Sequence, residues 1–234
     1  MSPRVAIVTG GAAGIGAAIV AGLRADGVRV IAGDLSGDPA DPVVPALDVT
    51  DPRSRGTFLD WVHGRFGRID ILVNNAGINN RRTALDSDWS DWQPVLAVNL
   101  GGTLEMSRGC FPYLDVSGTG CIVNLASSGG HVAIAGSAAY GVSKAAALHL
   151  TRILAVEWAP RIRVNSVSPT LVRTAMTADV LDDERYLADK LASIPLGRTP
   201  DPADVAATVR FLCGAGAAHI TAQDIAVDGG VTAR

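Results

Sequence analysis

Thr9-Gly10-Gly11-Ala12-Ala13-Gly14-Ile15-Gly16 is the stretch that decides the fold. It follows Val5–Val8, a short apolar run typical of a buried strand, and it opens a helical pattern over residues 15–23. Glycines let the backbone approach a pyrophosphate closely, and the N-terminus of the next helix offers free N–H groups to phosphates. The alternative is a tight turn that needs glycine only for its conformation. Three spaced glycines at the first strand–helix junction favour a dinucleotide site.

Strands and helices alternate along the rest of the chain. The further strands are expected at 28–32, 43–47, 69–73, 121–125, 162–167 and 225–227, and the further helices at 54–66, 89–113, 138–158 and 202–212. This order predicts an α/β fold, a doubly wound parallel sheet of about seven strands with helices on both faces. Pro45 weakens the 43–47 strand. The prolines and glycine of 36–42 leave room for little more than one turn where a crossover helix is usual.

Length and composition limit the classes of protein that fit. The 234 residues contain no linker or repeat, so one domain spanning 1–234 is expected. A net charge of −3 gives no general attraction to nucleic acid or to an anionic membrane. Neither a membrane span nor a secretion signal is expected from these residues. Three scattered cysteines without metal-type spacing indicate a reducing compartment, so a cytoplasmic protein without a metal site is expected.

Asp34 ends the second expected strand, 18 residues after Gly16. A carboxylate there can accept hydrogen bonds from the adenosine ribose hydroxyls of NAD and would repel the 2′-phosphate of NADP. Neither Ala12, Ala13 nor Leu35 offers a positive charge to such a phosphate. The alternative is a turn or capping aspartate, but the pattern favours NAD.

Tyr140 and Lys144 are spaced i, i+4 near the start of a helix, so their side chains lie on one face. A phenol titrates too high for proton exchange at neutral pH, and a nearby ammonium lowers its pKa, so the pair can act as a tuned acid/base. An ordinary surface pair is the usual meaning of this spacing. Lys144 and Lys190 are, however, the only lysines among 20 basic residues, which suggests that a compact ammonium is needed at Lys144.

Several motifs in order give the chain its resemblance to a known family. Thr9 to Gly16 resembles the Thr-Gly-x-x-x-Gly-x-Gly signature of short-chain dehydrogenases/reductases, and Asn74-Asn75-Ala76-Gly77 and Tyr140-x-x-x-Lys144 match two further motifs. Ser127 lies thirteen residues before Tyr140, as the family's catalytic serine does, and Asn99 sits where the family's helix asparagine does. Residues 224–230 look like its C-terminal strand. The resemblance covers the whole chain and implies a Rossmann-type fold.

The resemblance also implies roles for named residues. Tyr140 would exchange the proton of an alcohol or ketone oxygen, and Ser127 would hydrogen-bond the same oxygen. Lys144 would hold the nicotinamide ribose and lower the Tyr140 pKa, and Asn99 would position a water that links Lys144 to solvent. Thr174 and the backbone of Val172 would bind the carboxamide, and Asn75 and Ala76 would line the adenosine side. The expected cofactor-binding residues are Gly10, Ala13, Gly14, Ile15, Gly16, Asp34, Leu35, Asp48, Val49, Asn75, Ala76, Gly77, Tyr140, Lys144, Pro169, Val172 and Thr174.

Other positions stay open at this stage. Asp48 either faces the adenine or caps the next helix, and His131 either lies near the pocket mouth or is an exposed loop residue. Arg81 or Arg82 either recognises an acidic substrate or is a solvated charge. Thr170 replaces the family's usual glycine, which narrows the space beside the nicotinamide. Residues 170–195 resemble the family's mobile substrate loop.

The function expected is therefore NAD-dependent hydride transfer between nicotinamide and a secondary alcohol or ketone carbon. One alternative is an NADPH-dependent 3-oxoacyl carrier-protein reductase, which shares the catalytic motifs. The other is a noncatalytic NAD-binding regulatory protein, against which the intact Asn99, Ser127, Tyr140 and Lys144 argue. The long helices over 90–113 and 138–158 are rich in small residues and resemble the family's subunit interfaces, so a homotetramer is expected.

Overall fold

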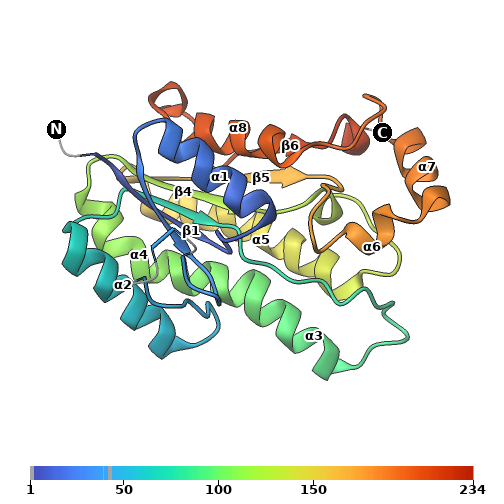
Figure 1. Cartoon of the computed structure of the whole chain (residues 1–234), viewed down its shortest axis with the longest axis horizontal. Coiled ribbons are helices and arrows are strands. Elements are labelled where there is room, and N and C mark those ends of the chain that lie inside the picture. The colour runs from blue at the N-terminus through green and yellow to red at the C-terminus, as the bar shows by residue number, and fades with distance from the viewer. Residues whose placement is uncertain (1–2, 39, 42–43, 234) are drawn as a thin grey trace.

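The computed structural model describes residues 3–38, 40–41 and 44–233. These residues form one parallel sheet of six strands in the order β2-β1-β3-β4-β5-β6 (Figure 1). The strands are β1 (Val5–Thr9), β2 (Arg29–Gly33), β3 (Ile71–Asn74), β4 (Gly120–Leu125), β5 (Ile162–Pro169) and β6 (Asp224–Val227). The strand order reverses beside β1, where β2 lies on one side and β3 on the other. The predicted doubly wound architecture is confirmed.

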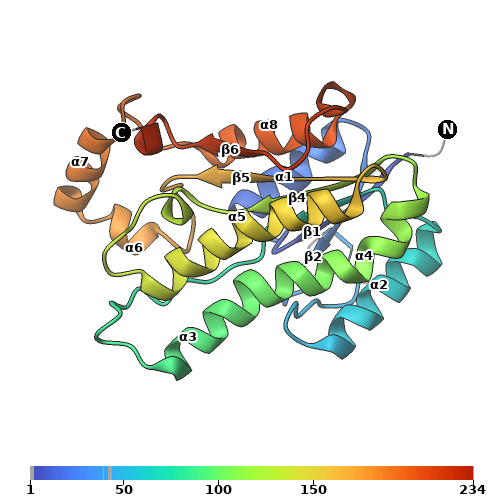
Figure 2. The ribbon, with the colours of Figure 1, turned by 180° about the vertical axis from the view of Figure 1, so that it is seen from behind.

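Helices cover both faces of the sheet (Figures 1 and 2). On one face, α1 (Gly14–Ala25) and α8 (Pro202–Cys213) pack on the strands through buried Ile19, Leu23 and Val209. On the other face lie α2 (Pro52–Phe66), α4 (Thr103–Val116) and α5 (Ala138–Trp158), with Phe58 and Met106 fully buried. Strands buried on both sides explain the continuous apolar runs in the sequence.

The strand expected at 43–47 does not form. Val43 lies outside the described residues, and residues 44–47 have no strand pairing. Pro45 lacks an N–H donor, and the segment is tied to the edge of the sheet by one backbone bond, from Leu47 N to the Asp34 carbonyl at 2.8 Å. Val44 and Leu47 are instead buried in the core beside α2, so hydrophobic burial retains the segment without a ladder. The described residues between β2 and this segment, 34–38 and 40–41, contain no helix, as predicted.

The long helix expected at 89–113 is divided by a π-helical segment. The structure has α3 (Trp89–Leu96), a π-helix over Ala97–Gly102 and then α4. Gly102 lets this segment pack closely on Val49, because a Cβ there would lie 2.6 Å from a methyl group of Val49. The π-segment carries Asn99, buried, toward the sheet edge. Such segments inside helices are frequent at functional sites.

The remaining elements surround the carboxyl edge of the sheet, or close the chain. They are a 3-10 turn at Ser128–Gly130 (η2), α6 (Ala178–Leu181), α7 (Glu184–Ser193) and 3-10 turns at Ala215–Ala217 and Val231–Ala233. α6 and α7 lie beyond the end of β5, within the predicted substrate loop 170–195 (Figure 1). Nowhere in the described part of the chain does a helix combine the length and apolar character that a bilayer crossing requires.

Candidate active site

The glycine turn forms one end of a pocket at the carboxyl edge of the sheet. Gly10 and Gly14 have φ values of 63° and 54°, a region that side chains disfavour. A Cβ on Gly16 would lie 2.0 Å from the Gly10 carbonyl oxygen. Ala13 precedes α1 and provides no side-chain cap, and the first turn of the helix contains no acidic residue. The N–H groups of this turn therefore have no capping side chain as their acceptor. This cradle fits a pyrophosphate.

The second turn at the sheet edge braces the first. Asn75 donates from Nδ2 to the carbonyl oxygens of Thr9 and Gly10, both at 2.9 Å. The Thr9 hydroxyl accepts from the backbone N–H groups of Asn75 and Ala76 at 3.0 Å. Asn75 and Ala76 thus line the pocket beside the glycine turn. The side chain of Asn75 is a brace of that turn, a role that its motif did not reveal.

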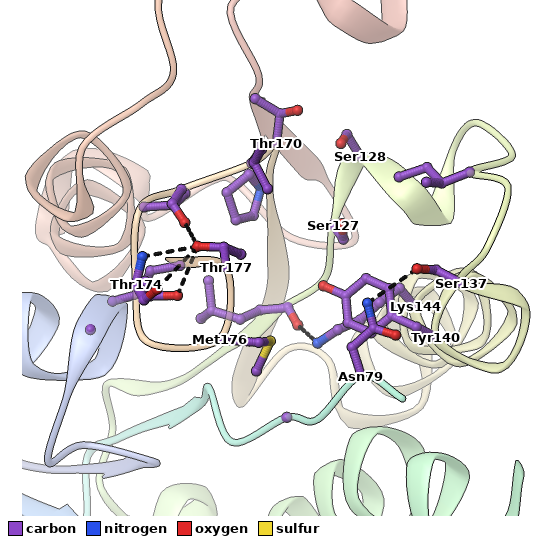
Figure 3. Close-up of a pocket in the computed structure, with 18 of the residues that line it drawn as sticks. Asn79, Ser127, Ser128, Ser137, Tyr140, Lys144, Thr170, Thr174, Met176 and Thr177 are labelled. Carbon is purple, nitrogen blue, oxygen red and sulfur yellow. Dashed lines mark hydrogen bonds between the residues drawn. The ribbon is translucent and has the colours of Figure 1, made fainter. Parts of the chain in front are cut away.

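Ser127 and Tyr140 meet at the other end of the same pocket (Figure 3). Ser127 follows β4 and its hydroxyl accepts from Gly129 N at 3.1 Å, which fixes the side chain at the start of η2. Tyr140 projects from the first turns of α5. Burial raises the pKa of Tyr140, and a hydrogen bond with the Ser127 hydroxyl opposes that rise. Desolvation is the larger of the two effects, and the lowering of the phenol pKa by Lys144 stays a prediction.

Lys144 is buried, with 5% of its surface exposed. Its Nζ donates to the Leu125 carbonyl at 2.7 Å and lies 5.7 Å from the Tyr140 ring centroid. Burial lowers the pKa of Lys144 to about 8. The ammonium lies beside Gly77 in the turn after β3, where a Cβ would be 3.5 Å from Nζ, an ordinary van der Waals contact.

Asn99 holds the turn after β3 against α5. Its Oδ1 accepts from Ile78 N at 2.8 Å, and its Nδ2 donates to the Ile78 carbonyl and the Ser143 hydroxyl, each at 2.9 Å. Ser143 in turn donates to the Tyr140 carbonyl at 2.7 Å. Sequence reasoning did not identify Ser143, although its place between Tyr140 and Lys144 could have drawn attention to it.

The loop after β5 closes a third side of the pocket. Thr177 holds this loop together through its hydroxyl, which accepts from Thr174 N at 3.0 Å and donates to the Val172 carbonyl at 2.5 Å (Figure 3). Thr174 lies against the glycine turn, since its methyl group would be 3.1 Å from a Cβ on Gly14. Val172 and Thr174 therefore line the pocket from this loop, and their binding of the carboxamide stays a prediction.

Thr170 follows Pro169 and lines the pocket with 8% of its surface exposed. Its hydroxyl has no hydrogen-bond partner within the described residues. Buried polar atoms normally have a hydrogen-bond partner, so a buried hydroxyl without one in a pocket wall indicates a place where a ligand atom can bind. The expectation that a side chain narrows this part of the pocket agrees with its position.

The aspartates of the expected adenosine side lie apart from this pocket. Asp34 follows β2, and its carboxylate accepts from Ala12 N at 3.2 Å and from the Ser36 hydroxyl at 3.2 Å. Asp48 accepts from the backbone and hydroxyl of Thr50, which lowers its pKa, whereas α2 is capped by Asp51. The helix-capping alternative for Asp48 is therefore wrong. Leu35 is exposed, and buried Val49 packs against Gly102.

Most of the predicted residues converge on the pocket. It is lined by Gly10, Ala13, Gly14, Ile15, Gly16, Asn75, Ala76, Gly77, Ser127, Tyr140, Lys144, Pro169, Val172 and Thr174. Asp34, Leu35, Asp48, Val49 and Asn99 are not in this lining. Asn99 lies behind the pocket wall, where its side chain bonds Ile78 and Ser143 and comes close to the lining residue Gly77.

Three loop residues left open by the sequence have distinct surroundings. His131 is outside the pocket lining and pairs with Asp224 of β6 at 2.8 Å. Arg82 pairs with Asp91 at 3.1 Å and is also outside it. Arg81 does line the pocket, and its guanidinium donates to the Met176 carbonyl across the opening.

A buried polar chain that the sequence did not reveal links the strand ends to the helices beneath them. Asn74 donates to Asn124 Oδ1 at 2.9 Å and to the Ser107 hydroxyl at 3.0 Å, and Asn124 donates to the Thr151 hydroxyl at 2.9 Å. These residues join β3 and β4 to α4 and α5. These hydrogen bonds between side chains fix the register of β3 against β4, the two strands that precede Asn75 and Ser127.

Comparison with known proteins agrees with this geometry. A family model described as enoyl-(acyl carrier protein) reductase matches residues 10–232. The chain is 38% identical to D-threitol dehydrogenase of Mycolicibacterium smegmatis, over 98% of this chain and 93% of that protein. It is 36% identical to 3-oxoacyl-acyl-carrier-protein reductase FabG of Thermotoga maritima, over 97% of each.

A solved structure shares both the fold and the length of the chain. It is a gluconate 5-dehydrogenase from Burkholderia cenocepacia in complex with NADP and tartrate, 27% identical, with a TM-score of 0.95. The match covers 100% of this chain and 97% of that one. The likeness extends across the sheet, the glycine turn and the loop after β5.

Proposed function

The chain belongs to the short-chain dehydrogenase/reductase family and is an oxidoreductase acting on alcohol and ketone groups, and on this premise we propose that it is an NAD-dependent dehydrogenase of secondary alcohols. One observation carries the proposal. A single pocket of about 430 Å³ joins the glycine turn to the hydroxyls of Ser127 and Tyr140. A cofactor on the turn and an alcohol at the hydroxyls would share one pocket.

The residues of the pocket would divide the work as follows. NAD, when bound, supplies the acceptor or donor of the hydride. Tyr140 removes the hydroxyl proton of the alcohol during oxidation and returns it to the carbonyl oxygen during reduction. Ser127 hydrogen-bonds that oxygen and stabilises the charge that develops on it. A raised pKa keeps Tyr140 protonated at neutral pH, which suits it to donate in the direction of reduction.

The other residues would hold the cofactor. Lys144 binds the nicotinamide ribose, Thr174 and the Val172 backbone bind the carboxamide, and Pro169 borders the ring. Asn99 orders a water that links Lys144 to solvent. The remaining cofactor contacts proposed are Gly10, Ala13, Gly14, Ile15, Gly16, Asp34, Leu35, Asp48, Val49, Asn75, Ala76 and Gly77.

NAD is proposed over NADP because of Asp34. Its carboxylate stands beside Ala12 at the end of β2, where it would meet the adenosine ribose, and a 2′-phosphate there would be repelled. We expect kcat/KM for NADH to exceed that for NADPH by at least about tenfold. Asp34→Asn keeps the shape and removes the charge, so it should reduce the preference. Asp60→Asn, on the exposed face of α2, is the matched control. A clear preference of the wild type for NADPH would refute this choice of cofactor.

A second candidate is an NADPH-dependent 3-oxoacyl carrier-protein reductase. The likeness to such a reductase over nearly the whole of both chains favours it, as does the NADP in the solved relative. The two candidates differ in a direct assay. Screening NADH production over a panel of secondary alcohols should give turnover for the first. Turnover confined to NADPH and a 3-oxoacyl thioester would favour the second.

We also propose that residues 1–234 act as one domain with a substrate loop at 170–195, in a cytoplasmic homotetramer. Three buried free cysteines suit a reducing compartment. Exposed apolar side chains on α5 and α8 support association: Val142, Ile153, Val156 and Phe211. Light scattering of the purified chain should give a mass four times that of one subunit, and a monomer would refute the assembly.

A further inference from the structure

We propose that Lys190 forms an anion-binding subsite in the pocket and that the substrates are therefore hydroxy acids and the corresponding oxo acids. The inference rests on the proposed function, because it assigns the substrate class of the same pocket. Its first support is the charge of the pocket wall. Three cations line it, Arg81, Lys144 and Lys190, and the described lining residues include no carboxylate.

Two of these three cations already have protein partners. The Lys144 ammonium donates to the Leu125 carbonyl at 2.7 Å. The Arg81 guanidinium donates to the Met176 carbonyl, so this residue links the loop after β3 to the loop after β5. The backbone of Arg81 is in the left-handed region, with a φ of 48°. Arg81 therefore shapes the opening.

Lys190 is the remaining cation. It is half-buried on α7, and the structure gives its ammonium no ion pair or hydrogen bond within the described residues. Arginines flanking α7 in sequence do find carboxylates. Arg173 pairs with Asp182 at 3.3 Å and Arg198 with Asp204 at 2.7 Å. A half-buried ammonium without a counter-ion in a wall of one charge sign is suited to receive an anion.

The helix directs Lys190 toward the pocket together with a second side chain. Tyr186 lies one turn earlier on α7 and also lines the pocket. Residues at i and i+4 share one helix face, so the pair forms the pocket side of α7. α7 belongs to the segment after β5, which resembles the family's substrate loop over 170–195. We therefore assign the ammonium to the substrate rather than to the cofactor pyrophosphate.

The substrate class follows from the two polar poles of this end of the pocket. A hydroxyl or ketone oxygen has to meet Ser127 and Tyr140, and an anionic group of the same molecule has to reach Lys190. A compact ammonium with three donors can donate hydrogen bonds to a carboxylate in several orientations. A hydroxy acid satisfies both poles, whereas a neutral alcohol leaves the ammonium unpaired.

Paired ligands that differ only in charge give the decisive test. Acetoacetate and acetoacetamide form one pair, and 4-oxocyclohexanecarboxylate and its amide form a second. Binding is measured by calorimetry to Tyr140→Phe loaded with NADH, in which no turnover consumes the ligand. We expect at least one acid to bind at least about tenfold more tightly than its amide. Lys190→Gln in the same background should remove that preference, and Lys190→Arg should restore part of it.

Controls separate this inference from its alternatives. Arg185→Gln, on the exposed side of α7, should leave the acid preference intact. If neither acid binds more tightly than its amide, or if Lys190→Gln weakens acid and amide equally, the subsite is refuted. If Lys190→Gln instead weakens NADH itself, the ammonium serves the cofactor phosphates and the inference is also refuted. Acid binding that depends on Lys190 without any turnover by the wild type would contradict the proposed function alone.

Discussion

The Lys144 ammonium lies 5.7 Å from the centroid of the Tyr140 ring, one turn away on α5, while its short hydrogen bond goes to the Leu125 carbonyl. The two residues therefore share a face of the helix but not a hydrogen bond in this structure. Lys144 anchors α5 to the end of β4, and Tyr140 reaches Ser127 at the start of η2. The pair is held in position from two neighbouring points on the sheet edge.

Tyr140→Phe should abolish turnover and leave NADH binding within about threefold of wild type. The change removes only the hydroxyl that exchanges the substrate proton, and general acid/base groups contribute typically 10²–10⁴-fold. The measurements are steady-state NADH production and a fluorescence titration of NADH. Tyr113→Phe, at a half-buried position on α4 outside the pocket lining, is the control that should keep full activity. Undiminished turnover by Tyr140→Phe would remove the acid/base from the mechanism.

The buried Lys144 should make stability depend on pH. Its pKa is about 8 in the folded chain against 10.5 ordinarily, so the unfolded chain binds more protons between these values. Stability then rises with pH through that window. Relative to Lys144→Met, the wild type should gain roughly 2 kcal/mol of unfolding free energy between pH 7 and pH 9.5. Urea unfolding of both chains measures this difference, and a pH-independent difference would show that the ammonium is not desolvated.

Much of the fold follows from local patterns, because strands buried on both faces are recognisable as apolar runs. The helix over 138–158 was predicted with the bounds that the structure gives. The prediction of a strand at 43–47 was wrong, because an apolar run does not reveal whether a neighbouring strand is available for hydrogen bonding. Pro45, which lacks an N–H donor, and the short preceding segment disfavour such pairing. The motifs located most of the pocket. Ser143, Asn124 and the brace formed by Asn75 were missed, since hydrogen bonds between distant segments leave no local periodicity.

Gly16→Ala should abolish cofactor binding and destabilise the chain. A Cβ at Gly16 would lie 2.0 Å from the Gly10 carbonyl oxygen, which is backbone that has to move. We expect NADH affinity to fall at least about a hundredfold and unfolding free energy to fall by roughly 2 kcal/mol, in the range of strained core substitutions. Gly64→Ala is the matched control, because its Cβ would meet open space in α2, where alanine favours the helix. NADH binding by Gly16→Ala near the wild-type affinity would contradict the cradle.

Thr170→Val should separate stability from activity. The valine keeps the shape of the buried side chain and removes a hydroxyl that has no partner within the described residues, so the unfolding free energy should rise by about 1 kcal/mol. If that hydroxyl bonds a ligand atom, kcat/KM should fall several-fold, and Thr170→Gly should instead widen the range of substrates. Thr151→Val is the control, because its hydroxyl accepts from Asn124 at 2.9 Å and its loss should cost about 1–3 kcal/mol. Thermal unfolding measures the stability of all three variants, and a panel of substrates measures their activity. A Thr170→Val chain that is destabilised but fully active would show that the hydroxyl serves the protein rather than the ligand.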